Sequence, residues 1–114
     1  MAELTAKIDE GWHLYALELP EGGPRPTRIS LPLDQPFELA DKIEVPAPHT
    51  DFDPNFNMNT SFYEGGVTFT LPIKVMEEMN EHKLAVNVRY QVCTKEQCLA
   101  PKTIKLETEI ETKN

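Results

Sequence analysis

Apolar and polar residues alternate along most of this chain. The first such run places Leu4, Ala6 and Ile8 between polar neighbours. Three longer runs follow, with apolar positions at Val67, Phe69, Leu71, Ile73 and Val75, then Leu84, Val86, Val88, Tyr90 and Val92, then Ile104, Leu106 and Ile110. A period of two residues is typical of strands with one buried face. Short strands separated by turns and ten prolines, with almost no helical pattern, predict an antiparallel β-sandwich.

Three segments depart from simple alternation. Residues 12–19 carry bulky side chains on both faces, which predicts a strand near the middle of a packed sheet, after a turn at residues 9–11. Residues 45–59 have little periodicity and many Asn, Asp and Pro residues, so we expect an irregular, functional loop there. Residues 76–82 are the one helix-like piece, expected to be a single turn.

Length and charge restrict the possible functions. A chain of 114 residues predicts one domain over residues 1–114, with a core of its own. The formal net charge of -8 argues against binding nucleic acid or an anionic membrane surface. No apolar run is long enough to insert into a membrane. Because a strand pattern begins by Leu4 without a signal peptide, we expect a domain excised from a larger exported or membrane-anchored protein.

The two cysteines, Cys93 and Cys98, have four residues between them and lie between the last two long strand patterns. We expect those strands to form a hairpin with the cysteines at its exposed tip. Because Val92 belongs to the alternate residues that face the core, Cys93 is expected to point away from the core or to end the strand. A disulfide ring of about six residues stabilises a fold by only about 2 kcal/mol, so the pair is better suited to thiol–disulfide exchange. A structural disulfide that pins the hairpin tip remains the alternative.

The histidines do not indicate a metal site. His13, His49 and His82 are scattered along the chain, without the paired spacing of zinc ligands. We therefore predict no metal and no cofactor.

Several motifs resemble one known family, the N-terminal periplasmic domain of DsbD-type thiol:disulfide interchange proteins, or disulfide bond corrector domain. They occur in the expected order over most of the chain. They are Gly11-Trp12-His13-Leu14-Tyr15, Gly22-Gly23-Pro24-Arg25-Pro26-Thr27, Ser61-Phe62-Tyr63-Glu64-Gly65, and Val88-Arg89-Tyr90-Gln91-Val92-Cys93 through Cys98-Leu99-Ala100-Pro101. Two differences stand out: the best-known members have one more residue between the cysteines, and acidic residues where this chain has Thr60 and Ser61.

The resemblance implies an all-β, immunoglobulin-like sandwich and assigns roles to six residues. Cys93 and Cys98 would be the redox pair, with Cys98 forming the mixed disulfide with a partner. Phe62, followed by Tyr63, would belong to a cap loop that shields the cysteines until a partner docks. The positions that line the active site from the neighbouring strand are matched by His13 and Tyr15.

The resemblance also implies a protein-disulfide reductase module in the periplasm. A membrane domain of the full-length protein would reduce it, and it would pass electrons to thioredoxin-like periplasmic proteins. The membrane domain and the C-terminal thioredoxin-like domain of the full-length protein are also expected partners. We expect the domain itself to be a monomer. The alternative function is a non-catalytic β-sandwich binding or assembly module with a structural hairpin disulfide, whose ligand surface would be residues 52–63.

Overall fold

The computed structural model describes residues 2–76 and 83–109, and every regular element within them is a β-strand. The strands are β1 (Ala2–Lys7), β2 (His13–Tyr15), β3 (Arg28–Ser30), β4 (Phe37–Leu39), β5 (His49–Asp53), β6 (Met58–Tyr63), β7 (Gly66–Leu71), β8 (Ile73–Val75), β9 (Lys83–Tyr90), β10 (Val92–Cys93) and β11 (Lys102–Glu109). All of their pairings are antiparallel. The prediction of an all-β antiparallel fold is confirmed.

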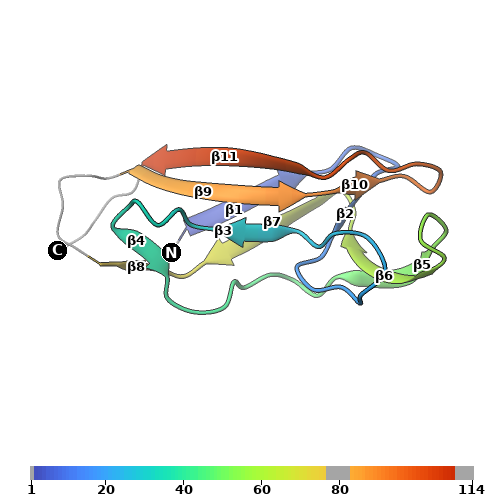
Figure 1. Ribbon diagram of the computed structural model, residues 1–114, viewed down its shortest axis with the longest axis horizontal. Helices are drawn as coiled ribbons and strands as arrows, with labels where there is room; N and C mark the ends of the chain where they lie inside the picture. The colour runs from blue at the N-terminus through green and yellow to red at the C-terminus, as the bar shows by residue number, and fades with distance from the viewer. Residues whose placement is uncertain (1, 77–82, 110–114) are drawn as a thin grey trace.

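The strands form an elongated sandwich, 49 × 24 × 22 Å in extent (Figure 1). One sheet has the order β11-β9-β3, and β1 pairs with β7 in another. A third sheet, β10-β2-β6-β5, lies toward the end of the molecule opposite the N-terminus (Figure 1). A short β4-β8 pair completes the described strands. The cysteine-bearing strand β10 therefore belongs to the sheet at one end of the domain.

The main core is built by the alternating residues of the long strands. The buried side chains of β7 and β9 are Val67, Phe69 and Leu71, and Leu84, Val86 and Val88. The apolar residues of β1 are half-buried against them, while its polar residues face solvent. The alternation predicted for these strands is thus confirmed, because one face of each strand is removed from water.

The last two long strands form the predicted hairpin. β9 and β11 pair in register from Lys83↔Glu109 to Tyr90↔Lys102. The chain between them contains β10 and both cysteines, so the cysteine pair lies at the connecting end of this hairpin. The register of two long strands fixes where that end is placed.

The irregular loop predicted at residues 45–59 is confined to residues 45–48, and the prediction is wrong for the rest of the segment. β5 and β6 pair as a hairpin, in register from His49↔Phe62 to Asp53↔Met58. Its turn includes Asn57 at φ 53°, a left-handed conformation that Asn adopts more readily than most residues. Because β5 is an edge strand whose side chains are mostly exposed, its sequence lacks the apolar alternation that would have revealed it.

The strand expected over residues 12–19 is shorter than predicted, because only β2 is regular there. Its three residues are all buried between β10 and β6, as expected for a strand inside a sheet. The turn predicted before it is present: Trp12 N–H donates to the Asp9 carbonyl at 3.0 Å, and Gly11 has φ +86°, which favours glycine. The helix-like piece expected at residues 76–82 lies outside the described residues, apart from Met76.

The packing of the main core predicts how much stability is lost when a large buried side chain is truncated. Phe69 is 1% exposed, so Phe69→Ala should lower the free energy of unfolding by about 3–5 kcal/mol. That is a large part of the roughly 5–15 kcal/mol typical of a domain. Urea unfolding followed by fluorescence measures the loss. Leu33→Ala, which truncates a fully exposed side chain, is the control, and equal losses in the two variants would contradict this assignment of the core.

Candidate functional site

The backbone of the hairpin holds the two cysteines together, in addition to the bond between them. Cys93 and Cys98 are joined by a disulfide, with Cα atoms 4.0 Å apart, and also form an isolated antiparallel bridge. Just outside the ring, Leu99 N–H donates to the Val92 carbonyl at 3.0 Å. The backbone pairing of the hairpin and the S–S bond thus both place the cysteines opposite each other.

A buried glutamine fastens both ends of this ring to the rest of the domain. The Gln91 side-chain amide donates to the Leu99 carbonyl at 3.2 Å. Its Oε1 accepts from the Arg25 backbone N–H at 3.1 Å. The Tyr-Gln-x-Cys motif and the segment around Arg25, which are distant in sequence, are thus joined beside the cysteines.

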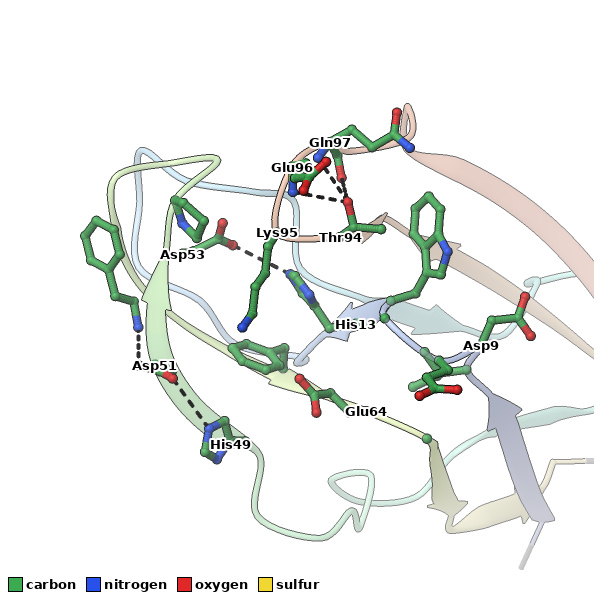
Figure 2. Close-up of a pocket in the computed structure, with 18 residues that line it drawn as sticks. Asp9, His13, His49, Asp51, Asp53, Glu64, Thr94, Lys95, Glu96 and Gln97 are labelled. Atoms are coloured by element: carbon green, nitrogen blue, oxygen red, sulfur yellow. Dashed lines mark hydrogen bonds and ion pairs between the residues drawn. The ribbon is translucent and has the colours of Figure 1, made fainter.

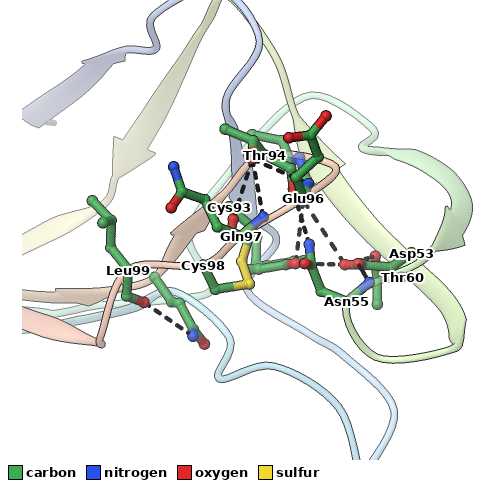
Figure 3. The surroundings of a disulfide bond; sticks show 12 residues. Asp53, Asn55, Thr60, Cys93, Thr94, Glu96, Gln97, Cys98 and Leu99 are labelled. Atoms are coloured by element: carbon green, nitrogen blue, oxygen red, sulfur yellow. Dashed lines mark hydrogen bonds and ion pairs between the residues drawn. A yellow bond between two sulfur atoms is a disulfide. The ribbon is translucent and has the colours of Figure 1, made fainter.

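A second, smaller apolar cluster contains both cysteines. Figure 3 shows their disulfide beside Thr94 and Leu99 of the hairpin. The buried members of the cluster are Tyr15, Phe62 and Cys93, and its partly buried members are Leu19, Phe56 and Cys98. Cys93 lies outside the main core, as the alternation of side chains along the strand predicted, but it is 0% exposed. The prediction of an exposed tip is therefore wrong for Cys93, because the second cluster encloses it, whereas Cys98 is only half-buried.

The structure brings Phe62 to the disulfide but not Tyr63. The Phe62 ring packs in the second cluster, with its centroid 4.6 Å from the His13 ring and 5.4 Å from the His49 ring. Tyr63 lies in the main core, where its ring meets Phe69 and its hydroxyl donates to a backbone carbonyl at 2.7 Å. Successive residues of a strand point to opposite faces, which explains the separation.

His13 and Tyr15 also meet at the site, in a buried hydrogen-bonded chain that ends on Asp53. The Tyr15 hydroxyl donates to Asp53 Oδ2 at 2.5 Å. Since the hydroxyl has a single proton, its oxygen accepts from His13, whose Nε2 lies 3.2 Å away. Thr60 Oγ1 donates to the same Asp53 Oδ2 at 3.2 Å. This arrangement assigns the His13 proton to Nε2.

Burial decides the protonation of these two groups. It lowers the pKa of His13 from its ordinary 6.5, against the smaller opposing effects of the Asp53 and Glu64 carboxylates. His13 is therefore neutral at pH 7, and its 3.8 Å contact with Asp53 is not an ion pair at that pH. Burial, followed by the hydrogen bond to Asp53, raises the pKa of Tyr15 far above its usual 10, so Tyr15 remains a phenol and a donor.

Three site residues were not predicted from the sequence: Asp53, Asn55 and Phe56. Asn55 Nδ2 donates to the Thr94 carbonyl at 2.7 Å, and the Phe56 ring centroid lies 6.2 Å from that of Tyr15. All three lie in the segment expected to be a functional loop. Its Asp-Pro-Asn sequence is a turn signal that could have indicated a hairpin. Nothing in the sequence joins that turn to a residue 39 positions later.

Comparison with known proteins agrees with this geometry. The family model described as "Thiol:disulfide interchange protein DsbD, N-terminal" matches residues 1–110. The chain belongs to this DsbD N-terminal domain family. Among solved structures, the DsbD N-terminal domain of Neisseria meningitidis in the reduced form is similar, with a TM-score of 0.62 and 12% identity, over 94% of this chain and 74% of that one. No curated protein matches the chain.

Membership in the DsbD family confirms two expectations. The fold is immunoglobulin-like, since that is the fold of the DsbD N-terminal domain that it matches. The family also supports a module for thiol:disulfide interchange, and the structure contains a Cys93–Cys98 disulfide. Among residues 2–76 and 83–109, no three His, Cys, Asp or Glu side chains form a group that could hold a metal ion. In the same residues there is no helix that could cross a membrane.

In this DsbD-family domain, a groove of about 950 Å³ lies beside Phe62 and the cysteine ring (Figure 2). It runs between the β1–β2 turn, the edge strand β5 and the ring. Its exposed charged side chains are Asp9, Glu10, Asp51, Glu64 and Glu96, with Lys95 as the one cation among them. The surface next to the covered disulfide is therefore predominantly negative.

The pKa of His13 predicts how stability depends on pH. The pKa of His13 is lower in the folded domain than in the unfolded chain, where it is about 6.5. As the pH falls through about 6.5, the unfolded chain therefore takes up a proton before the folded domain does. The free energy of unfolding decreases until the pH passes the folded pKa. His13→Gln should remove this part of the loss, which amounts to about 1.4 kcal/mol for each tenfold difference between the proton affinities of the folded and unfolded states. Urea unfolding at pH 7.5 and pH 5.0 measures it.

The exposed His49 provides a matched control, since its side chain is 67% exposed. His49→Gln should keep the loss of stability seen in the unaltered domain between the two pH values. An undiminished loss in His13→Gln would show that this histidine is not the buried group responsible.

Proposed function

We propose that this domain is a periplasmic thiol–disulfide exchange module, in which reduced Cys93 and Cys98 pass two electrons to an oxidised protein partner. The observation that carries the proposal is that the disulfide lies outside the main core, in a small cluster under Phe62. A ring of about six residues contributes only about 2 kcal/mol to stability, and its backbone is already held by hydrogen bonds. Family membership supports the same reaction.

The exchange takes two steps. The Cys98 thiolate attacks one sulfur of the partner disulfide, forms the mixed disulfide and releases the partner's first thiolate, which takes up a proton. The Cys93 thiolate then attacks the Cys98 sulfur. This step forms the Cys93–Cys98 disulfide and releases the partner's second thiolate. The partner ends as a dithiol, reduced by the two electrons that the domain has lost.

Burial supports assigning the first attack to Cys98. Cys93 is 0% exposed at the base of the second cluster, whereas Cys98 is half-buried. An attacking thiol needs an in-line approach to the other sulfur, so the more accessible residue is the better site for the mixed disulfide. Cys93 is then the resolving thiol, already placed beside it by the hairpin.

In this proposal Phe62 is the cap that shields the pair between encounters. Its ring is buried with Cys93 and is packed against His13. His13 and Tyr15 line the site and support the ring from β2. Tyr63 contributes indirectly, because its packing in the main core anchors β6 next to the cap. Rotation of the Phe62 side chain on contact with a partner would then open a path to the sulfurs.

The proposed partners are thioredoxin-like proteins, and the domain would act as a monomer. Within a larger protein of the DsbD type, a membrane domain would reduce residues 1–114, and a C-terminal thioredoxin-like domain would be a further partner. The domain itself makes no membrane insertion in this scheme. Family membership supports the thioredoxin-like partners, and the exchange measured below tests them.

The reduction potential separates this function from the alternative of a binding module with a structural disulfide. For a carrier we expect the Cys93–Cys98 pair to equilibrate in the thioredoxin-like range, about -270 mV or higher. Titration against glutathione or dithiothreitol buffers, with trapping of free thiols by alkylation, measures it. A potential below about -300 mV would identify a structural bond and favour the binding module.

Single cysteine variants test the two roles. Cys93→Ser should trap a mixed disulfide with an oxidised thioredoxin-like protein, because the resolving thiol is missing, whereas Cys98→Ser should trap almost none. Non-reducing electrophoresis and mass spectrometry measure the complex. The two variants are matched, since each removes one sulfur atom. A complex that still forms through Cys93 alone, in Cys98→Ser, would overturn the assignment of roles, and failure of both variants to react would reject the exchange function.

A further inference from the structure

Phe62 is only one of two segments that cover the disulfide. The other is the turn of the β5–β6 hairpin, residues 54–57, between the last strand pair Asp53↔Met58. Phe56 of this turn packs in the second cluster with both cysteines, and its ring meets that of Tyr15 edge-on. Figure 3 shows Asn55 of the same turn between the cysteine ring and Asp53.

A hydrogen bond attaches this turn to the cysteine ring. Asn55 Nδ2 donates to the Thr94 carbonyl at 2.7 Å. Thr94 directly follows Cys93 and organises the ring, since its Oγ1 accepts from the backbone N–H of Glu96 at 3.2 Å and of Gln97 at 3.1 Å. The bond from Asn55 therefore reaches an ordered part of the ring, next to the buried sulfur.

The base of the turn is also held. Asp53 Oδ1 accepts from the Asn55 backbone N–H at 3.0 Å, and the Phe56 N–H donates to the Asp53 carbonyl at 3.3 Å. The other carboxylate oxygen, Asp53 Oδ2, accepts hydrogen bonds from the hydroxyls of Tyr15 and Thr60. Asp53 is 2% exposed. With its base fixed in this way, the turn is kept against the ring by the Asn55 side chain and the packing of Phe56.

We propose that residues 54–57 are a second cover of the Cys93–Cys98 disulfide, and that Asn55 is the positioning residue that keeps this cover closed. The inference rests on the proposed exchange at the same pair. Asn55 acts through Thr94 and touches no reacting atom. Breaking its bond frees the turn to move Phe56 away from the cluster, which opens a second approach to the half-buried Cys98 sulfur.

The test measures how fast a small thiol reaches the disulfide of the oxidised domain. A dithiothreitol thiolate attacks the Cys98 sulfur and releases the Cys93 thiolate; its second thiol then releases Cys98 and leaves oxidised dithiothreitol. Asn55→Ala should raise the second-order rate constant by about 2- to 10-fold, the change in opening expected from one lost hydrogen bond. Asn55→Asp, which keeps the shape but not the donor, should also raise it. Rapid alkylation and mass spectrometry follow the reaction.

Asn59→Ala is the matched control, because Asn59 is an exposed asparagine of the same hairpin. Its rate should equal that of the unaltered domain, and thermal unfolding should show all variants folded at the temperature used. Phe62→Ala provides the comparison for the first cover. If the two covers act independently, the rate increases of Asn55→Ala and Phe62→Ala should multiply in the double variant.

Two results would overturn the inference: wild-type rates in both Asn55 variants, or the same increase in Asn59→Ala as in Asn55→Ala. The first would show that the turn does not limit access, and the second that any loosening of the hairpin has this effect. Failure of the proposed exchange function can be told apart from failure of the second cover, because reduction by dithiothreitol needs no protein partner. A faster reaction in Asn55→Ala together with no trapped complex in Cys93→Ser would keep the cover and reject the exchange.

Discussion

The carboxylate of Asp53 is the polar group on which the arrangement of the proposed redox end depends, which is the sheet β10-β2-β6-β5 with the Cys93–Cys98 disulfide. It is almost completely removed from water, and a buried carboxylate without hydrogen bonds is very unfavourable. Its partners come from three places: Tyr15 in β2, Thr60 in β6 and the backbone of Asn55 in the turn. Satisfying this single group therefore fixes β2, the β5–β6 hairpin and its turn relative to one another.

This polar network makes the redox end a packing unit separate from the main core. The main core is apolar and is formed by the alternating residues of strands such as β7 and β9. The second cluster has only three buried members, of which one is Cys93, and hydrogen bonds complete its boundary. Because most of the apolar burial lies elsewhere, the opening proposed for this site would leave the core that stabilises the domain intact.

The sequence predicts the long strands well because burial on one face imposes a visible period. The runs that begin at Val67 and at Leu84 are examples, and the hairpin at the cysteines follows from their order. The structure divides the first run into β7 and β8 and the second into β9 and β10, so each predicted strand is shorter than its run. The edge strand β5 was missed because its exposed side chains are under no such constraint. The resemblance to known domains pointed to Phe62, and strand parity alone would have separated it from Tyr63. Asp53 and Asn55 were not predictable in the same way, because their partners Tyr15 and Thr94 are 38 and 39 residues away and no local pattern encodes such contacts.

One hairpin carries both covers, but the two are held in different ways. Phe62 lies within β6, and its backbone pairs with Tyr15 on one side and His49 on the other. Its ring can leave the disulfide only by side-chain rotation, because moving the backbone would break two ladders. The turn lies beyond the last pair, Asp53↔Met58, so it can move as a segment while both ladders stay intact. In the proposed exchange, a partner that contacts this end of the domain would thus meet a rotating ring and a hinged turn, and its access to Cys98 would depend on both.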